Sequence, residues 1–234
     1  MGSAACDAIA ACEDLELVAR VDVDDAMSTL EKADVAVDFT SPSAVMDNVR
    51  WCIGRGVSAV VGTSGFTEQK LRSVQRLLTD APQVGVLVVP NFSIGAVLMM
   101  RFAAEAARFF ESVEIVEMHH PTKVDAPSGT ARRTAELVAA ARSEAQLAAM
   151  PDATAQASDG ARGATIDGIA VHSVRVRGLV AHQEVLLGGT GETLVIRHDS
   201  LDRTSFMPGV IAAVRAMPGR RGLHVGLDSV LGLD

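Results

Sequence analysis

The chain has 234 residues, 48% of them hydrophobic, and a formal net charge of −8 at pH 7. This length suits one large or two small domains, and we expect two. The negative charge and the lack of a basic stripe argue against nucleic acid as a partner. No apolar run approaches about 18 uncharged residues, which argues against a membrane span. Three cysteines without Cys-x-x-Cys spacing and a start without a signal-peptide pattern indicate a cytoplasmic protein with reduced thiols and no zinc site.

The first residues have the pattern of part of a dinucleotide-binding unit. Residues 2–12 are small and favour a helix, and residues 15–21 read as a strand that ends at Asp22. In such folds an acidic residue about 20 positions beyond the glycine fingerprint binds the adenosine ribose. Counting from Gly2 puts Asp22 at that place. Taken alone, an aspartate at a strand end is more often a turn former.

Further short apolar runs read as strands with helices between them: residues 34–39, 40–54, 58–61, 67–78 and 84–89. Near-continuous small and β-branched residues are typical of parallel strands that are covered on both faces. Two of these strands end in turns rich in glycine or polar residues, at residues 62–65 and 90–93. Ligands of open α/β sheets bind at the carboxyl ends of the strands, so we expect these turns to face a ligand.

Residues 117–131 form the stretch around which the chain is organised, and they read Glu-Met-His-His-Pro-Thr-Lys-Val-Asp-Ala-Pro-Ser-Gly-Thr-Ala. They follow a strand-like run and precede a helix-like run to Arg142, so two imidazoles, an ammonium and a helix N-terminus converge on one loop. A helix N-terminus offers unpaired amides to an anion. If the strand persists, His119 and His120 point to opposite sides, so that one could exchange a proton while the other binds. Each residue taken alone would read as part of a surface turn.

The second half of the chain predicts a different sheet. Residues 93–110 have helical spacing, and residues 143–163 lack periodicity and read as a surface excursion. Short separations between three later strands require antiparallel neighbours; these strands are residues 169–176, 182–187 and 193–198. A last helix is expected over residues 207–217, and residues 223–231 are expected to return to the first domain.

We therefore predict an α/β protein with a Rossmann-like parallel sheet domain, residues 1–92 with 208–234, and an α+β domain with a mixed sheet, residues 93–207. His172, His182 and His198 fall on expected strands, but their spacing fits no compact zinc pattern, so structural roles are favoured. A Ser-His-Asp hydrolase is disfavoured because the chain has no Gly-x-Ser-x-Gly elbow.

The pattern Glu-x-His-His-x-x-Lys-x-Asp-Ala-Pro-Ser-Gly-Thr-Ala resembles the signature of the 4-hydroxy-tetrahydrodipicolinate reductase family, formerly called dihydrodipicolinate reductases. These are nicotinamide-dependent enzymes of the diaminopimelate and lysine pathway. The resemblance extends over most of the chain, through residues 38–40, 61–66, 90–95 and 197–200.

The resemblance implies NADH or NADPH as cofactor, a small dicarboxylate substrate and a homotetramer built through the second domain. It implies that His119 donates the proton that follows hydride transfer, and that Lys123 assists. The implied substrate-binding residues are His120, Ser128, Gly129 and Thr130. The implied cofactor-binding residues are Asp22, Gly62, Thr63, Ser64, Val89, Pro90, Asn91 and Phe92.

Two alternatives stay open. A reductase of similar architecture that acts on another cyclic dicarboxylate would be favoured if 2,6-pyridinedicarboxylate failed to inhibit. A relative that binds dicarboxylate but no dinucleotide would leave NADH fluorescence unchanged. The preference between NADH and NADPH also stays open, although Asp22 favours a free 2′-hydroxyl group.

One part of the family pattern has little counterpart here. The family's Gly-x-x-Gly-x-x-Gly loop places a pyrophosphate on the first helix, and only Gly2 matches it, as the third glycine. We therefore expect the written start to be an internal methionine, with an apolar strand and a Gly-x-x-Gly segment upstream in the gene. The chain as written is expected to fold poorly and to bind NADH weakly.

Overall fold

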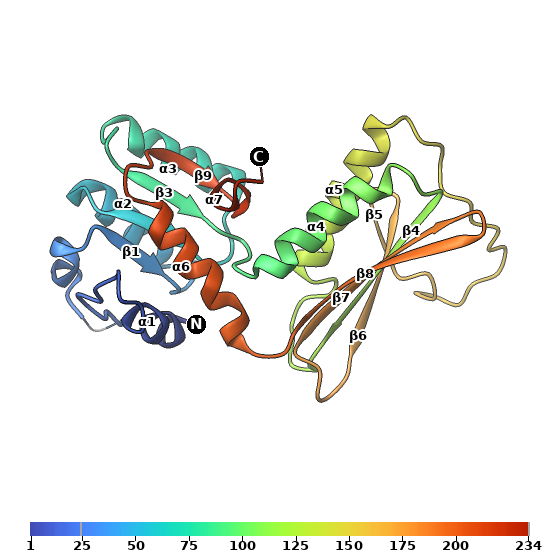
Figure 1. The fold of residues 1–234 in the computed structure, drawn as a ribbon, viewed down its shortest axis with the longest axis horizontal. Coiled ribbons are helices and arrows are strands. Elements are labelled where there is room, and N and C mark those ends of the chain that lie inside the picture. The colour runs from blue at the N-terminus through green and yellow to red at the C-terminus, as the bar shows by residue number, and fades with distance from the viewer. Residues whose placement is uncertain (24, 234) are drawn as a thin grey trace. The chain divides into compact units, whose positions relative to one another are not determined.

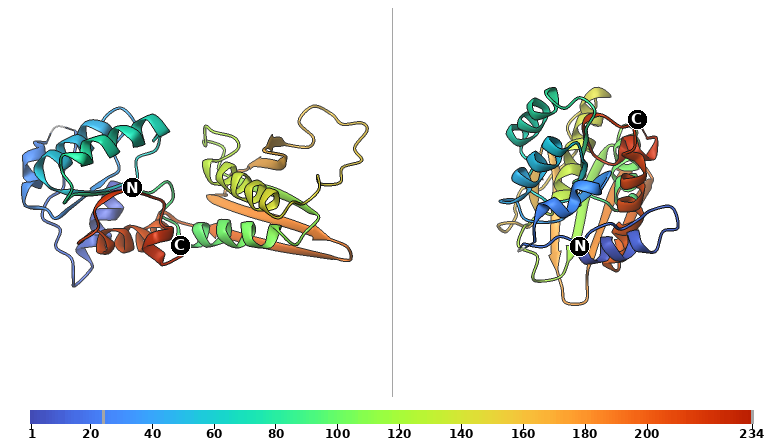
Figure 2. Two further views of the ribbon diagram at one scale, coloured as in Figure 1. Left: turned by 90° about the horizontal axis from the view of Figure 1, so that it is seen from above. Right: turned by 90° about the vertical axis from the view of Figure 1, so that its left-hand side faces the viewer.

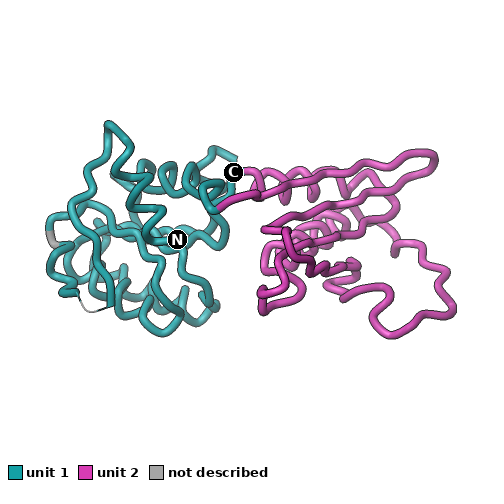
Figure 3. The backbone as a smooth tube through the Cα atoms, turned by 90° about the horizontal axis from the view of Figure 1, so that it is seen from below, with its two compact units in different colours: residues 1–94, 203–234 teal, residues 95–202 magenta. Residues whose placement is uncertain are grey.

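The computed structural model describes residues 1–23 and 25–233, and it divides into two compact units, residues 1–94 with 203–234 and residues 95–202 (Figure 3). Asp24 and Asp234, both within the expected dinucleotide-binding domain, lie outside the described residues. No helix in the described ranges is long and apolar enough to cross a membrane.

The first unit contains a sheet whose strands run parallel in the order β1-β2-β3-β9 (Figure 1). The strands are β1 (Val35–Asp38), β2 (Ser58–Val61), β3 (Gly85–Val88) and β9 (Gly222–Val225). The α-helices are α1 (Gly2–Ala10), α2 (Val45–Arg55), α3 (Glu68–Thr79), α6 (Met207–Ala216) and α7 (Asp228–Leu231), with 3-10 turns η1 (Met27–Lys32) and η2 (Arg203–Phe206).

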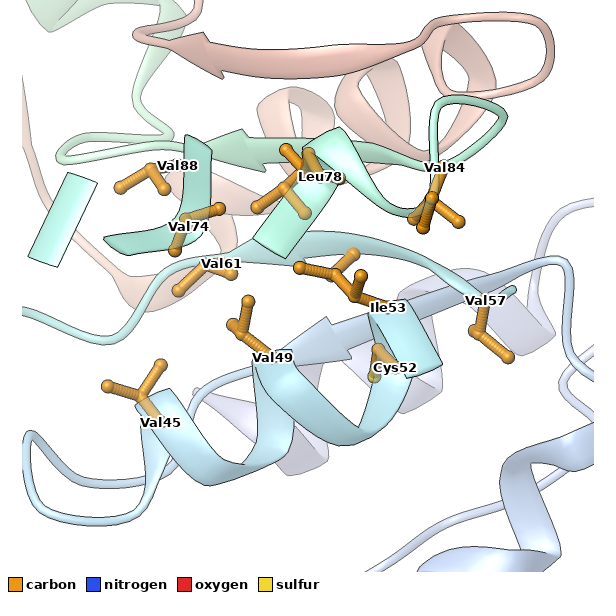
Figure 4. Close-up of a cluster of buried hydrophobic side chains, with 13 residues drawn as sticks. Val45, Val49, Cys52, Ile53, Val57, Val61, Val74, Leu78, Val84 and Val88 are labelled. Atoms are coloured by element: carbon orange, nitrogen blue, oxygen red, sulfur yellow. The ribbon is translucent and has the colours of Figure 1, made fainter. Parts of the chain in front are cut away.

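Both faces of this sheet are covered, as the apolar strand sequences predict. On one face, Ala59 and Val61 pack with α2 and α3 in a buried core (Figure 4). On the other face, Val60 and Leu87 are fully buried, and α6 lies along that side in two perpendicular views (Figures 1 and 2). Since burying each such side chain contributes about 1.5–3 kcal/mol, this packing fixes the strands and therefore the turns at their ends.

The predicted strand over residues 15–21 is wrong, because the structure assigns no strand there. A strand is held by ladder hydrogen bonds to a neighbour, and none of the described strands pairs with this run. Asp22 consequently lies in an exposed turn rather than at a strand end, and its Oδ1 accepts a hydrogen bond from the Val23 amide at 2.8 Å.

The second unit contains a mixed sheet in the order β5-β6-β4-β7-β8. Its strands are β4 (Ser112–His119), β5 (Ala164–Ile166), β6 (Ile169–Arg175), β7 (Ala181–Gly189) and β8 (Glu192–Ser200), and its helices are α4 (Ile94–Ala107) and α5 (Gly129–Glu144). Val113 and Ile115 of β4 are buried against small residues of α4 and α5, including Ala103 and Ala135. These helices therefore cover one face of the sheet.

The prediction that the three later strands are antiparallel neighbours is half right. β7 and β8 pair antiparallel, but β6 and β7 do not pair with each other, because β4 lies between them. Residues 176–180 connect β6 to β7, and an extended connection covers about 3.3 Å per residue, enough to pass one intervening strand. The expected fold class, a Rossmann-like parallel sheet domain plus a mixed sheet, is confirmed.

Candidate active site

The loop between β4 and α5 is held at both ends by regular structure. His119 is the last residue of β4, and Ser128 is the N-cap of α5, where its Oγ accepts a hydrogen bond from the Ala131 amide at 3.1 Å. Because side chains alternate along a strand, Glu117 and His119 lie on the face of β4 that packs against the helices. Arg175 stands beside His119 on the parallel neighbour β6.

Glu117 is fully buried and accepts hydrogen bonds from three segments of the chain. Arg175 donates to both carboxylate oxygens, at 2.7 and 2.8 Å. His119 Nδ1 lies 2.6 Å from Oε2, and the Ser128 amide donates to Oε1 at 3.1 Å. Burial alone would raise the pKa of Glu117, but the hydrogen bonds from His119, Arg175 and Ser173 outweigh burial and lower the pKa to about 2. The carboxylate is therefore ionised at neutral pH.

This carboxylate decides which nitrogen of His119 can react. An ionised carboxylate only accepts hydrogen bonds, so His119 must carry a proton on Nδ1. The other ring nitrogen, Nε2, is then the atom that can exchange a proton with a ligand. The imidazole is not sealed off, since 14% of its side-chain surface is accessible. His119 is thus arranged as a general acid or base.

Lys123 and the start of α5 already hold a carboxylate, that of Asp125. Lys123 Nζ donates to Asp125 Oδ1 at 2.7 Å. Burial raises the pKa of Asp125, while the Lys123 ammonium and the Gly129 amide bring it below its usual value. A Cβ atom added to Gly129 would meet nothing within 4 Å, so open space faces the helix start. An ammonium and a helix-terminal amide can take the carboxylate of a ligand in the same way.

The other residues predicted to bind substrate have different surroundings. His120 is exposed, and its Nδ1 lies 2.7 Å from Thr122 Oγ1. Ser128 is buried, and its hydroxyl and amide both make hydrogen bonds within the fold. Thr130 is half-buried in the first turn of α5, where its carbonyl accepts from the Thr134 hydroxyl at 2.8 Å. The Ser128 side chain therefore shapes the loop, whereas His120 stands open to solvent.

Apart from Asp22, the residues predicted to bind the cofactor follow β2 and β3 at their carboxyl ends. Ser64 and Pro90 are exposed and Asn91 is half-buried. The buried members of the set are Thr63, Val89 and Phe92. A buried side chain acts through the backbone shape that it imposes, so the side chains that can touch a ligand here are those of Ser64, Pro90 and Asn91.

Asp38, the last residue of β1, fastens the turn after β2. Its Oδ1 accepts from Thr63 Oγ1 at 2.5 Å and from the Thr40 amide at 3.0 Å, and its Oδ2 accepts from Asn48 Nδ2 at 2.8 Å. These donors come from the turn after β1, the turn after β2 and α2. One carboxylate at the end of β1 therefore fixes three neighbouring segments relative to each other.

Gly62 is required by packing. A Cβ atom added there would lie 2.2 Å from Phe39 Cε1 and 2.7 Å from Phe92 Cε2. The two rings contact each other, with centroids 5.4 Å apart. The contact of Gly62 with a cofactor stays a prediction, and the structure shows that its lack of a side chain lets this aromatic pair close.

Three network residues, Glu117, Arg175 and Asp38, were not among the predicted site residues. Glu117 had a detectable signal, because it continues the inward row of Val113 and Ile115 at a spacing of two. Arg175 had none, since it reaches Glu117 only through the pairing of β6 with β4, 58 positions apart.

Two of the three strand histidines, His172 and His182, each lie beside a carboxylate of a neighbouring strand. His182 Nδ1 lies 2.6 Å from Asp199 Oδ1, and its Nε2 accepts from the Val180 amide at 3.2 Å. His172 Nε2 lies 2.8 Å from Glu114 Oε2. Within the described residues, no three His, Cys, Asp or Glu side chains gather as metal ligands.

Comparisons with known proteins cover both units. Family models described as dihydrodipicolinate reductase, N-terminus, and dihydrodipicolinate reductase, C-terminus, match residues 1–92 and 95–231. The chain is 59% identical over 234 residues to the 4-hydroxy-tetrahydrodipicolinate reductase of Cutibacterium acnes, covering 100% of this chain and 95% of that protein. The Streptomyces griseus enzyme of the same name is 56% identical over 236 residues, covering 100% of this chain and 94% of that protein.

Solved structures agree. The dipicolinate-bound dihydrodipicolinate reductase from Paenisporosarcina sp. TG-14 superposes with a TM-score of 0.86 at 38% identity, covering 97% of this chain and 94% of that chain. An amine dehydrogenase from Mycobacterium smegmatis, at 14% identity and a TM-score of 0.55, shares the fold. With both family models and both full-length relatives in agreement, the chain belongs to the dihydrodipicolinate reductase family.

Proposed function

We propose that this protein reduces 4-hydroxy-tetrahydrodipicolinate to tetrahydrodipicolinate with NADH or NADPH, within diaminopimelate and lysine biosynthesis. The observation that carries the proposal is the buried, ionised Glu117 that holds His119 in the loop of Lys123 and the α5 N-terminus. Full-length relatives at 56–59% identity have the corresponding name. A structure at 38% identity holds dipicolinate, a flat dicarboxylate.

We assign to His119 the donation of the proton that completes the reduction. After loss of water from the 4-hydroxy compound, reduction adds a hydride at C4 of the conjugated imine, and the resulting enamine carbon then needs a proton. An imidazole suits this step because both of its protonation states are reachable near neutral pH. His119 Nε2 is the free nitrogen, since Nδ1 is held by Glu117. Lys123 assists the proton transfer and holds a substrate carboxylate.

The two substrate carboxylates are assigned to the positive and amide groups of the same loop. Lys123 and the amides of Gly129 and Thr130 would bind one through charge-assisted hydrogen bonds. This carboxylate would take the place of the Asp125 carboxylate beside Lys123. The exposed His120 would bind the other. Ser128 supports this arrangement as the N-cap of α5.

We assign dinucleotide binding to residues 1–92 with 208–234, and substrate binding and oligomerisation to residues 93–207. The family uses a pyridine nucleotide, and the strand ends fit one, because exposed Ser64 and half-buried Asn91 offer polar groups where open α/β sheets bind ligands. When bound, the nicotinamide supplies the hydride. An acidic side chain at the ribose favours a free 2′-hydroxyl group, and the exposed Asp22 is assigned this contact without a choice between NADH and NADPH.

A homotetramer in the cytoplasm is also part of the proposal. The sheet of the second unit carries Leu186 and Val195 on the face away from the helices, and they are 38% and 50% exposed. Exposed apolar side chains on an uncovered sheet face favour association. Light scattering that found a stable monomer at micromolar concentration would contradict this assembly.

The test is to follow the oxidation of NADH and of NADPH with the 4-hydroxy substrate and purified protein, with and without dipicolinate. Turnover that dipicolinate inhibits is the expected result. Turnover without inhibition would favour a reductase of another cyclic dicarboxylate. Dipicolinate binding with no change in NADH fluorescence would instead identify a dicarboxylate-binding protein.

A further inference from the structure

We infer that Glu117 is a positioning residue for the reaction: it sets the tautomer of His119 and ties that imidazole to the helix start that receives the substrate carboxylate. The inference rests on the proposed function and deepens it. It names the group that aligns the acid, His119, with the anion site at the N-terminus of α5. Glu117 itself is fully buried, so it acts through His119 and the helix start rather than by direct contact.

Glu117 fixes the position of the proton on His119. The Nδ1–Oε2 distance of 2.6 Å is that of a charge-assisted hydrogen bond. Since Oε2 can only accept, Nδ1 always donates, and the neutral ring must leave Nε2 as the acceptor. After protonation the imidazolium carries its second proton on Nε2, directed away from Glu117. The carboxylate thereby restricts proton exchange to a single ring nitrogen.

Glu117 also aligns the start of α5 with His119 at the end of β4. The other oxygen, Oε1, accepts from the Ser128 amide at the N-cap of α5. Arg175 grips both oxygens and also donates to the Asp125 carbonyl at 2.8 Å. One carboxylate therefore fixes the end of β4 and the beginning of α5, while its counter-ion holds the loop between them. A shift of about 1 Å between an acid and its substrate can lower turnover by about 10²-fold.

A purely structural role explains the buried charge of Glu117 poorly. Positions 113 and 115 in the same inward row are apolar and fully buried. Replacing a buried ion pair by apolar side chains is often neutral or stabilising, so packing alone does not call for a carboxylate here. The donors that converge on Glu117 lie on β6, at the end of β4 and at the N-cap of α5, so they hold both ends of the loop that contains Lys123.

The experiment combines a spectroscopic signature with a kinetic cycle. In protein labelled with ¹⁵N at its six histidines, the His119 resonances are assigned by their loss in His119→Gln. In the ligand-free wild type we expect Nδ1 protonated and Nε2 unprotonated in the neutral ring. In Glu117→Gln the amide N–H can face Nδ1, and we expect the opposite tautomer or a mixture. An unchanged tautomer would overturn the inference, and this readout does not depend on reductase activity.

The kinetic cycle asks whether Glu117 acts through His119. Glu117→Gln should lower kcat by about 10-fold or more while the KM for NADH changes little, and it should have an effect of less than about twofold in the His119→Gln background. Equal losses in both backgrounds would assign Glu117 to folding alone.

A second variant covers the case in which Glu117→Gln fails to fold, because it leaves Arg175 without its buried partner. The pair Glu117→Gln with Arg175→Met removes both charges, and the same tautomer and kinetic readouts apply. Arg175→Lys is the matched control, since it keeps Glu117 ionised: it should retain the wild-type tautomer. If Arg175→Lys changes the tautomer as Glu117→Gln does, Glu117 is not what sets it.

Discussion

Each unit of the molecule uses one carboxylate to hold its candidate site, but the two carboxylates have different partners. Glu117 in the second unit is fully buried and binds a guanidinium, an imidazole and an amide. Asp38 in the first unit is half-buried and binds hydroxyl and amide groups. Neutral donors suffice to fix the shape of a turn. The charged network around Glu117 instead fixes which nitrogen of His119 carries a proton.

A glycine in each of the two regions, Gly62 and Gly129, also has different surroundings. Gly62 is enclosed by Phe39 and Phe92, whereas Gly129 faces open space. The turn after β2 is therefore closely packed, whereas the start of α5 has open space beside it. The contrast distinguishes a glycine that packing requires from a glycine whose surroundings leave room for a ligand.

Acid should weaken the second unit more than the first. The pKa of Glu117 is lowered from 4.5 to about 2 in the folded chain, so its ionised form stabilises the second unit by about 3 kcal/mol above pH 4.5. A depressed folded pKa means that this stabilisation is lost as the pH falls from 4.5 through about 2. The measurement is urea unfolding at neutral pH and at about pH 3.

The chain offers a natural reporter for this measurement. Trp51 on α2 is its single tryptophan, and it has no tyrosine, so fluorescence reports on the first unit while far-UV circular dichroism reports on both. We expect the acid shift in the circular dichroism transition and a smaller shift in fluorescence. Glu117→Gln should lack the acid-dependent part. Equal shifts of both signals would mean that the units unfold together.

His119→Gln should preserve the fold and cofactor binding while lowering kcat by about 10²-fold, the usual order for removal of one general acid. The effect should lie in kcat rather than in KM, since the substrate carboxylates are held elsewhere. Steady-state kinetics check this, with His172→Gln as the control because His172 contacts Glu114 away from the loop. If turnover stays within about twofold of wild type, His119 is not the acid, and the proton must come from Lys123 or water.

Alanine substitutions at Gly62 and Gly129 should distinguish the glycine that packing requires from the glycine that lies beside open space. Gly62→Ala places a Cβ 2.2 Å from Phe39 and should destabilise the first unit by about 1–3 kcal/mol through overpacking. Gly129→Ala meets no atom within 4 Å and should change stability by less than about 0.5 kcal/mol. Trp51 fluorescence in urea measures the first, and circular dichroism the second. A stable Gly62→Ala protein would show that the aromatic pair can move aside.

Gly129→Val should block the approach of a dicarboxylate to the α5 N-terminus. We expect the KM for the dicarboxylate to rise by about 10-fold, the loss of one charge-assisted contact, with the KM for NADH unchanged. Gly129→Ala serves as the smaller step in the same direction. Should thermal stability fall and both Michaelis constants change together, Gly129 would be a capping residue only.

Several strands and the loop of the candidate site can be predicted from local sequence patterns. Apolar runs with a spacing of two locate β4, and near-continuous β-branched runs locate β2 and β3 as strands buried on both faces. The order of His119, Lys123 and Ser128 between a strand and a helix start also predicts a loop that brings positive charge to a helix N-terminus. These features depend on neighbours in the chain, which is why the sequence determines them.

Other features arise only when distant segments meet. Residues 15–21 have strand-like composition, yet no described strand pairs with them, so no ladder forms. The insertion of β4 between β6 and β7 brings Arg175 to Glu117, and the closing of Phe39 on Phe92 makes Gly62 indispensable. Such contacts depend on sheet order and on the space left between side chains. Sequence spacing carries no record of either, and the tertiary structure alone decides them.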